Sequence, residues 1–174
     1  GSHISYNDRG GIVVRNGAVH NMQIGSCDIE GNMDENGPPS ANVLIDMSDG
    51  RMLEGAIIGC TVQHYHSAGV SANIRFSGHG TENRGATGNF TIADNIFSDT
   101  QHNIDIQYAR GIIITGNTFW KGYTHNIIIK DSEHMLLSNN LFDRNPTYRS
   151  TDSNNGIIIQ NSSDLTINGM HLYN

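Results

Sequence analysis

A short phrase that returns along the chain constrains its fold more than any other feature. In each copy an asparagine or glycine precedes two apolar residues spaced two apart, and the copies are Asn42-Val-Leu-Ile, Asn73-Ile-Arg-Phe, Asn103-Ile-Asp-Ile, Asn126-Ile-Ile-Ile and Gly156-Ile-Ile-Ile. Self-similarity with a period of about 20–30 residues is typical of solenoids, in which no unit can bury its apolar face alone. The phrase therefore predicts a stack of similar coils.

Around this phrase, apolar and other residues alternate as they do in a strand with one buried face. The first strand of each coil is expected to point inward at Ile12/Val14, Val43/Ile45, Ile74/Phe76, Ile104/Ile106, Ile127/Ile129 and Ile157/Ile159. The second strand is expected to do so at Met22/Ile24, Gly55/Ile57, Phe90/Ile92, Ile112/Ile114, Met135/Leu137 and Leu165/Ile167. A third inward column follows at Ile29, Val62, Phe97, Phe119, Phe142 and Leu172. Because stacked strands lie about 4.8 Å apart, we expect the phenylalanines to stack inside the solenoid.

A further column lies two positions before the third apolar one, at Cys27, Cys60, Asn95, Asn117, Asn140 and Met170. We expect each asparagine amide to bond to the next coil, because a buried polar group needs a hydrogen-bond partner. The two cysteines occupy this column on neighbouring coils. We expect buried free thiols, since an in-register disulfide between stacked strands would be strained.

Charge and composition exclude several classes of protein. The chain of 174 residues has a formal charge of −7 and only 10 Lys and Arg residues, which argues against a nucleic-acid partner. No apolar run is long enough to span a membrane, so no membrane partner is expected. The leading Gly1-Ser2-His3 is typical of an expression-tag scar. We expect residues 4–174 to form one domain.

Coils of strand, turn, strand and loop resemble the right-handed parallel β-helix superfamily, which includes pectate lyases, polygalacturonases, phage tailspikes and the parallel β-helix repeat group. The resemblance covers about residues 10–174 and implies an all-β solenoid of about six coils. A leucine-rich repeat is the architectural rival, but its leucine spacing and helical half-repeat are absent from the sequence. Without a visible cap at either end, we expect a fragment of a longer protein, or a homo-oligomer that pairs its exposed ends.

Side chains that flank the inward pairs of the first strand point outward and form two columns. The columns are Val13, Leu44, Arg75, Asp105, Ile128 and Ile158, and Arg15, Asp46, Ser77, Gln107, Lys130 and Gln160. The polar residues gather in the middle coils, beside expected long turns at residues 46–56, 77–89 and 143–155. Our candidate catalytic residues are Asp105, Arg75 and Asp46. The alternative is that Arg75 and Asp105, stacked on adjacent coils, form an ordinary surface ion pair.

The candidate substrate-binding residues lie in or near the same groove. They are His102, His125, Lys130, Gln107, Arg144 and Trp120. The two histidines precede the asparagine of consecutive coils and should stack. The basic residues could hold the carboxylates of an acidic sugar, and an exposed tryptophan can stack on a sugar ring.

No metal site and no cofactor are expected from the sequence. His64 and His66 lie in a loop without further ligands. Calcium needs several oxygen ligands around one ion, and no column places carboxylates on adjacent coils, so nothing in the sequence supports it.

The fold-level resemblance implies an extracellular or cell-surface protein that processes a polysaccharide, as a lyase or a glycoside hydrolase. The alternative is a non-catalytic structural, adhesive or sugar-binding segment, because Asp46 and Asp105 are expected to lie too far apart for glycoside hydrolysis. A carboxylate in a loop, such as Glu82, Asp99 or Asp152, could complete the pair, but the sequence does not place these residues. Whether the chain is an enzyme is therefore left open. If it is one, Asp105→Asn should abolish activity with little effect on stability.

Overall fold

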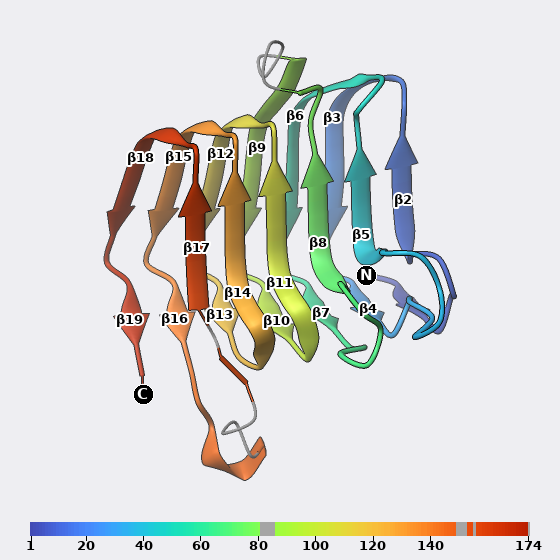
Figure 1. The fold of residues 1–174 in the computed structure, drawn as a ribbon, viewed down its shortest axis with the longest axis vertical. Helices are drawn as coiled ribbons and strands as arrows, with labels where there is room; N and C mark the ends of the chain where they lie inside the picture. Colours follow the sequence, from blue (N-terminus) through green and yellow to red (C-terminus); the bar gives the residue numbers. More distant parts are fainter. Residues whose placement is uncertain (81–85, 149–152, 155, 174) are drawn as a thin grey trace.

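The computed structural model describes residues 1–80, 86–148, 153–154 and 156–173, and within them the chain winds into a parallel β-helix (Figure 1). The first sheet contains β2 (Ile12–Arg15), β5 (Ala41–Asp46), β8 (Ala72–Ser77), β11 (Thr100–Gln107), β14 (Gly122–Lys130) and β17 (Gly156–Gln160). The second contains β3 (Ala18–Gly25), β6 (Arg51–Ile58), β9 (Thr87–Ala93), β12 (Arg110–Thr115), β15 (Glu133–Ser138) and β18 (Ser163–Asn168). The third contains β1 (His3–Ser5), β4 (Asp28–Glu30), β7 (Thr61–Gln63), β10 (Ile96–Ser98), β13 (Thr118–Phe119), β16 (Leu141–Phe142) and β19 (His171–Leu172).

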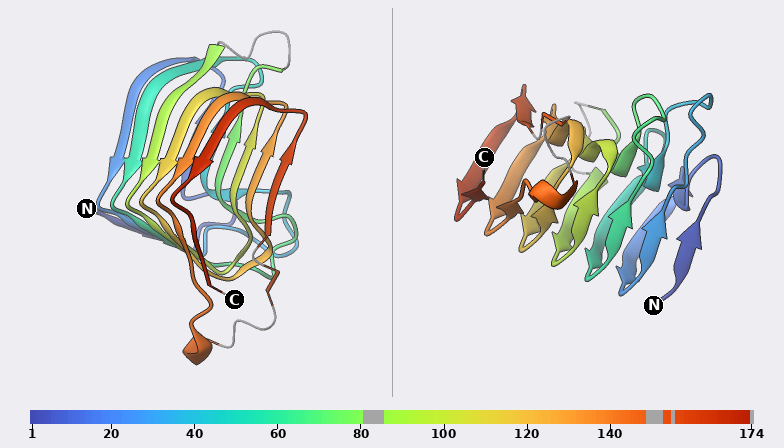
Figure 2. Two further views of the ribbon diagram at one scale, coloured as in Figure 1. Left: turned by 90° about the vertical axis from the view of Figure 1, so that its left-hand side faces the viewer. Right: turned by 90° about the horizontal axis from the view of Figure 1, so that it is seen from below.

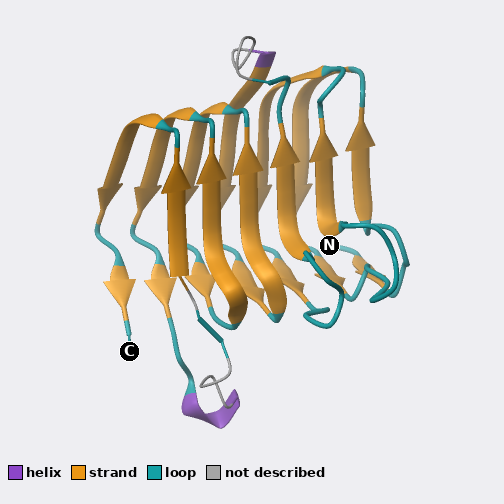
Figure 3. Cartoon of the chain, viewed as in Figure 1, coloured by secondary structure: helices purple, strands orange, loops and turns teal. Residues whose placement is uncertain are grey.

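Seen along the stack, the three sheets enclose a narrow prism, and the two termini lie at its opposite ends (Figure 2). Strands and the turns between them account for almost the whole described chain (Figure 3). A 3-10 turn at Pro146–Tyr148 projects from the body, and none of the described residues forms an α-helix. Accordingly, the described residues include no helix that could cross a bilayer.

The register of the sheets confirms the predicted inward pairs. In the first sheet Ile74 pairs with Val43 on one side and with Ile104 on the other. In the second sheet Ile92 pairs with Ile57 and Ile114. A register shift of one residue would turn every apolar side chain outward, so burial of these columns fixes the stacking of the coils.

Aromatic and polar ladders fill the interior as the sequence predicted. The Phe97 and Phe119 rings stack with centroids 5.2 Å apart, and those of Phe119 and Phe142 lie 5.0 Å apart. In the asparagine ladder, the Nδ2 group of Asn95 donates to Oδ1 of Asn117, and Asn117 donates to Asn140, both at 3.0 Å. These bonds satisfy amides that are almost completely buried.

A second asparagine ladder, which the sequence analysis did not anticipate, lies at the start of the first sheet. It is formed by the asparagines of the repeated phrase and one loop residue, with amide-to-oxygen distances between 2.6 and 3.0 Å, and runs through Asn32, Asn42, Asn73, Asn103 and Asn126. All five are buried. The asparagine that opens the phrase is therefore a structural residue that ties one corner of the prism together.

The third sheet has seven strands where six were expected, because β1 lies before the first predicted coil. Ile4 pairs with Ile29, and the carbonyl of Ser2 accepts a hydrogen bond from the Asp28 N–H at 2.9 Å. Residues 2 and 3 thus continue the solenoid register. Their origin in an expression tag stays a prediction.

The long turn predicted at residues 46–56 is shorter than expected. β6 begins at Arg51, because the buried Met52 pairs with Val19 and extends the second sheet toward the turn. The other two predicted turns lie partly outside the described residues. Two further loops, residues 31–40 and 64–71, join the third sheet to the first and project near the N-terminal end of the stack (Figure 1).

Candidate functional site

Arg75 and Asp105 form an ion pair on adjacent coils, but the pair is buried and does not lie on the surface. Arg75 is 9% exposed and Asp105 is 5% exposed. The Nε group of Arg75 donates to Oδ2 of Asp105 at 3.0 Å, and its two terminal nitrogens donate to the carbonyls of Ser40 and Val70. The guanidinium thereby joins both N-terminal loops to the first sheet. The pair performs a structural task, and a catalytic role for it stays a prediction.

The remaining oxygens of the two candidate aspartates are also engaged. Gln107 donates from Nε2 to Oδ1 of Asp105 at 3.1 Å. Asp46 accepts hydrogen bonds from the Ser48 amide and hydroxyl through Oδ1, and its Oδ2 lies 3.8 Å from Nε of Arg15. Neither carboxylate offers an oxygen without a partner.

His102 and His125 stack as predicted, with ring centroids 5.6 Å apart. The Nδ1 atom of each ring is buried and has no hydrogen-bond partner among the described residues. Burial lowers the pKa of His102 to about 4, with a smaller opposing effect from Asp105, and burial also lowers the pKa of His125. Lys130 contributes to lowering both pKa values. Both imidazoles are therefore neutral at pH 7.

The last two candidate residues lie outside the strands of the first sheet. Trp120 is half-buried, and its backbone carbonyl accepts a hydrogen bond from Asn103. Arg144 lies in the segment between β16 and β17, where it donates to the carbonyl of Ser153 at 3.4 Å. The structure thus brings together Arg75, Asp105, Gln107, His102, His125 and Lys130, whereas Asp46 interacts with Ser48 and Arg15.

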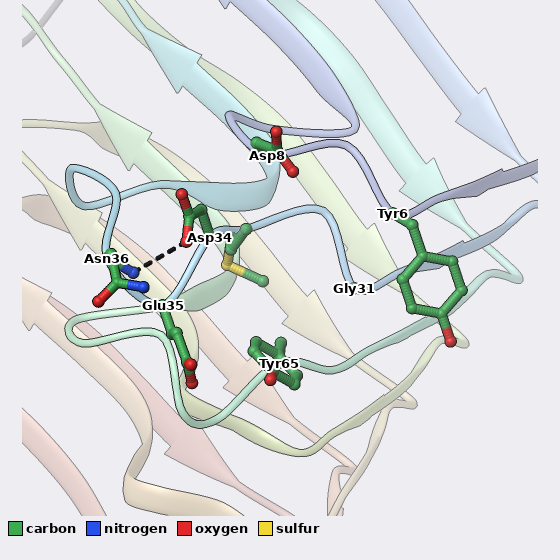
Figure 4. Close-up of a pocket in the computed structure, with 8 residues that line it drawn as sticks. Tyr6, Asp8, Gly31, Asp34, Glu35, Asn36 and Tyr65 are labelled. Carbon is green, nitrogen blue, oxygen red and sulfur yellow. Dashed lines mark hydrogen bonds between the residues drawn. The ribbon is translucent and has the colours of Figure 1, made fainter.

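A pocket of about 360 Å³, absent from the sequence-based prediction, lies where loop 31–40 meets the N-terminal coil and loop 64–71 (Figure 4). Its lining residues are Tyr6, Asp8, Gly31, Met33, Asp34, Glu35, Asn36 and Tyr65. Sequence reasoning missed it because the two loops come from different coils, and only the stacking places them side by side.

A cluster of three metal-ligating side chains lies on the outer face of β1 and β4. The His3 Nδ1 atom lies 2.9 Å from Oδ2 of Asp28, and its Nε2 atom lies 3.8 Å from Oε1 of Glu30. One ligand atom from each residue falls within 4.8 Å of the others. The sequence analysis missed this group because His3 was assigned to a tag.

Comparison with protein families shows what the chain is similar to. A family model described as "Periplasmic copper-binding protein (NosD)" matches residues 6–174. The chain belongs to the NosD family. Searches of curated proteins and of solved structures found no significant match for this NosD-family chain. The family's periplasmic description is compatible with the predicted location outside the cytoplasm.

Membership in the NosD family corrects one expectation. The sequence analysis predicted no cofactor and no metal, whereas the family is described as copper-binding. The mixed imidazole and carboxylate cluster draws on two coils.

The donors of that cluster suit copper. Imidazole nitrogen and carboxylate oxygen are ligands that copper(II) accepts, and copper(II) binds such sites more tightly than the other divalent first-row metals. Oδ1 of Asp28 is buried and has no hydrogen-bond partner among the described residues. Glu30 is oriented through Oε2 by a 3.1 Å hydrogen bond from Gln63, as ligating carboxylates commonly are. His3, Asp28 and Glu30 therefore fit the metal that the family description names.

Proposed function

We propose that this NosD-family chain is a periplasmic β-helix module that binds copper(II) through His3, Asp28 and Glu30. The observation that carries the proposal is the convergence of three ligand atoms within 4.8 Å on two paired strands. His3 would supply a nitrogen lone pair, and the two carboxylates would supply negative charge. Copper, when bound, would supply a redox-active centre.

The geometry of the paired strands supports this assignment. His3 and Asp28 are direct cross-strand partners, and Glu30 lies two residues farther along β4 on the same face. Pairing of β1 with β4 therefore holds the three donor residues in place before the ion binds. Copper binding then requires little further ordering of the chain. The His3 side chain is about half exposed, which leaves room for water as a further ligand.

The experiment is a copper(II) titration of the protein, followed by electron paramagnetic resonance and calorimetry. We expect His3→Ala and Asp28→Asn each to lower the affinity by about tenfold or more. His171→Ala is a matched control, because His171 occupies the same column at the opposite end of the third sheet, next to Leu141. Unchanged binding in both cluster variants would reject the assignment.

A second candidate function is glycan binding along the outer face of the first sheet. The observation that favours it is the pair of neutral, stacked imidazoles of His102 and His125, both of which are partly exposed on this face. The exposed edge of a neutral imidazole can exchange a hydrogen bond with a sugar hydroxyl. We propose binding rather than the predicted lyase or hydrolase chemistry, because the oxygens of Asp105 are engaged by Arg75 and Gln107.

Pectin, alginate and glycosaminoglycan oligosaccharides would be titrated into the protein, and each mixture would be assayed for reducing ends and unsaturated products. The proposal predicts binding that His125→Ala weakens and that substitution of the exposed His20 leaves unchanged. Release of products would instead restore the catalytic hypothesis. Absence of binding to every polymer would reject both.

A further inference from the structure

The pocket beside the N-terminal coil differs from the copper cluster and from the outer face of the first sheet. Its volume of about 360 Å³ lies in the range of small-molecule sites. Asp8, Asp34 and Glu35 contribute three carboxylates, and no basic residue lines the pocket. The described residues form no ion pair with these three groups. The pocket is therefore strongly acidic and has no internal counter-charge.

Two tyrosines complete the lining. Tyr6 is 78% exposed and Tyr65 is 41% exposed. The Tyr6 ring lies against the backbone of Gly31, where an added Cβ would come within 3.2 Å of the ring carbon Cε1. Gly31 also has a φ of +64°, so two independent constraints favour glycine there. The Tyr6 ring is thus packed against Gly31, while most of its surface stays exposed.

The rest of the lining holds these groups in place. Met33 is buried, and its backbone pairs with Arg9. The Asp34 N–H donates to the Asp8 carbonyl at 3.1 Å, which ties the loop to the first coil. Oδ1 of Asp34 accepts the Asn36 N–H at 2.9 Å (Figure 4). Arg9 itself contributes nothing to the lining.

We propose that this pocket binds a small protonated amine. Carboxylates attract the ammonium group, and the negative face of a tyrosine ring stabilises a cation placed over it. The chain's formal charge of −7 adds a general attraction for cations. An anionic ligand would meet three uncompensated carboxylates, and a neutral ligand would leave them without a counter-charge.

An amino sugar and an aliphatic amine both carry such an ammonium group. To distinguish them, D-glucosamine and cadaverine would each be titrated into the protein by calorimetry, in metal-free buffer of low ionic strength. N-acetylglucosamine has the same sugar ring as glucosamine but no charge. We expect at least one amine to bind and N-acetylglucosamine not to bind. The tighter of the two amines identifies the source as an amino sugar or an aliphatic amine. Binding should weaken as salt is added, since the carboxylates lie at the surface.

Tyr6→Ala and Glu35→Gln are each expected to lower the affinity for the amine about two- to fivefold. Because Tyr6 is mostly exposed, its removal leaves the core intact. Tyr173→Ala is the matched control, an exposed tyrosine at the other end of the stack. The proposal is overturned if neither amine binds, if N-acetylglucosamine binds as tightly as glucosamine, or if both pocket variants bind like the unmodified protein.

Discussion

The Nε atom of Arg75 lies 3.0 Å from Oδ2 of Asp105 in a pair that is almost completely shielded from water. Removing one partner of a buried ion pair leaves the other charge unpaired, which costs far more than the loss of a surface pair. This relationship reverses the expectation that Asp105→Asn would hardly affect stability. The residues that seemed best suited to catalysis are those that join two loops to the sheet.

We therefore expect Asp105→Asn to lower the free energy of unfolding by about 3 kcal/mol. Arg15→Gln is the control, because Arg15 is exposed and lies 3.8 Å from Asp46, and it should change stability by no more than about 0.5 kcal/mol. Urea unfolding of the two variants measures the difference. Equal, small effects would mean that the pair contributes no more than a surface pair.

The asparagine ladder leads to a second stability prediction. Asn117→Ala removes the acceptor for two donors of Asn95 and the donor to the carbonyl of Ile92. Leaving buried polar groups without partners should destabilise the protein by about 2–3 kcal/mol. Asn168→Ala, at an exposed position of β18, is expected to be nearly neutral. Chemical denaturation of the two variants measures the free energies of unfolding. An Asn117→Ala variant as stable as the unmodified protein would refute a stabilising role for the ladder.

Burial of His102 makes stability depend on pH. Its pKa is about 4 in the folded protein against an ordinary value of 6.5, so the unfolded chain takes up the proton at higher pH. Stability from this residue is complete above pH 6.5 and is lost as the pH falls toward 4.

Replacing His102 with glutamine should remove that part of the pH dependence, while replacing the exposed His20 should not. The comparison requires unfolding free energies at pH 7.5 and pH 5 for each variant. If His102→Gln loses as much stability on acidification as the unmodified protein, the buried imidazole is not the cause.

The two cysteines should differ in reactivity. Both are free, and the Cys27 N–H lies 3.5 Å from the sulfur of Cys60. Cys60 is 2% exposed, and burial raises the pKa of its thiol. A thiol reagent should modify Cys27 first and reach Cys60 only when the coil opens. Cys27→Ala should eliminate the fast phase of thiol modification. A fast phase that persists in this variant would contradict the assignment of that phase to Cys27.

Copper should stabilise the folded protein if the cluster on β1 and β4 binds it. A free ion concentration one hundred times the dissociation constant corresponds to about 2.7 kcal/mol, or an increase in Tm of about 5–10 °C for a domain of this size. At the same copper concentration Asp28→Asn should show at most about half of this increase, and a chelator should reverse the increase in the unmodified protein. An identical shift in Asp28→Asn would place the copper elsewhere.

Much of the fold follows from local pattern. The alternation at Ile104 and Ile106, and its recurrence at Ile127 and Ile129, specifies strand, inward face and register, because only one alignment of the coils buries every copy. The phenylalanine stack and the first asparagine ladder follow from the same repeat. β1 was missed because its three residues are too few to show a period.

The candidate sites depend on distances between side chains on different coils, and a sequence period does not specify those distances. The repeat places Arg75 beside Asp105, but only the packing of loops 31–40 and 64–71 buries the pair. The pocket that contains Tyr6 and Tyr65 likewise exists because two irregular loops meet. The sequence alone thus determined the winding of the chain, since burial of repeated apolar residues is an additive, local requirement. Tertiary structure alone decided which polar groups are shielded and which remain open to a ligand, because desolvation depends on everything that surrounds a residue.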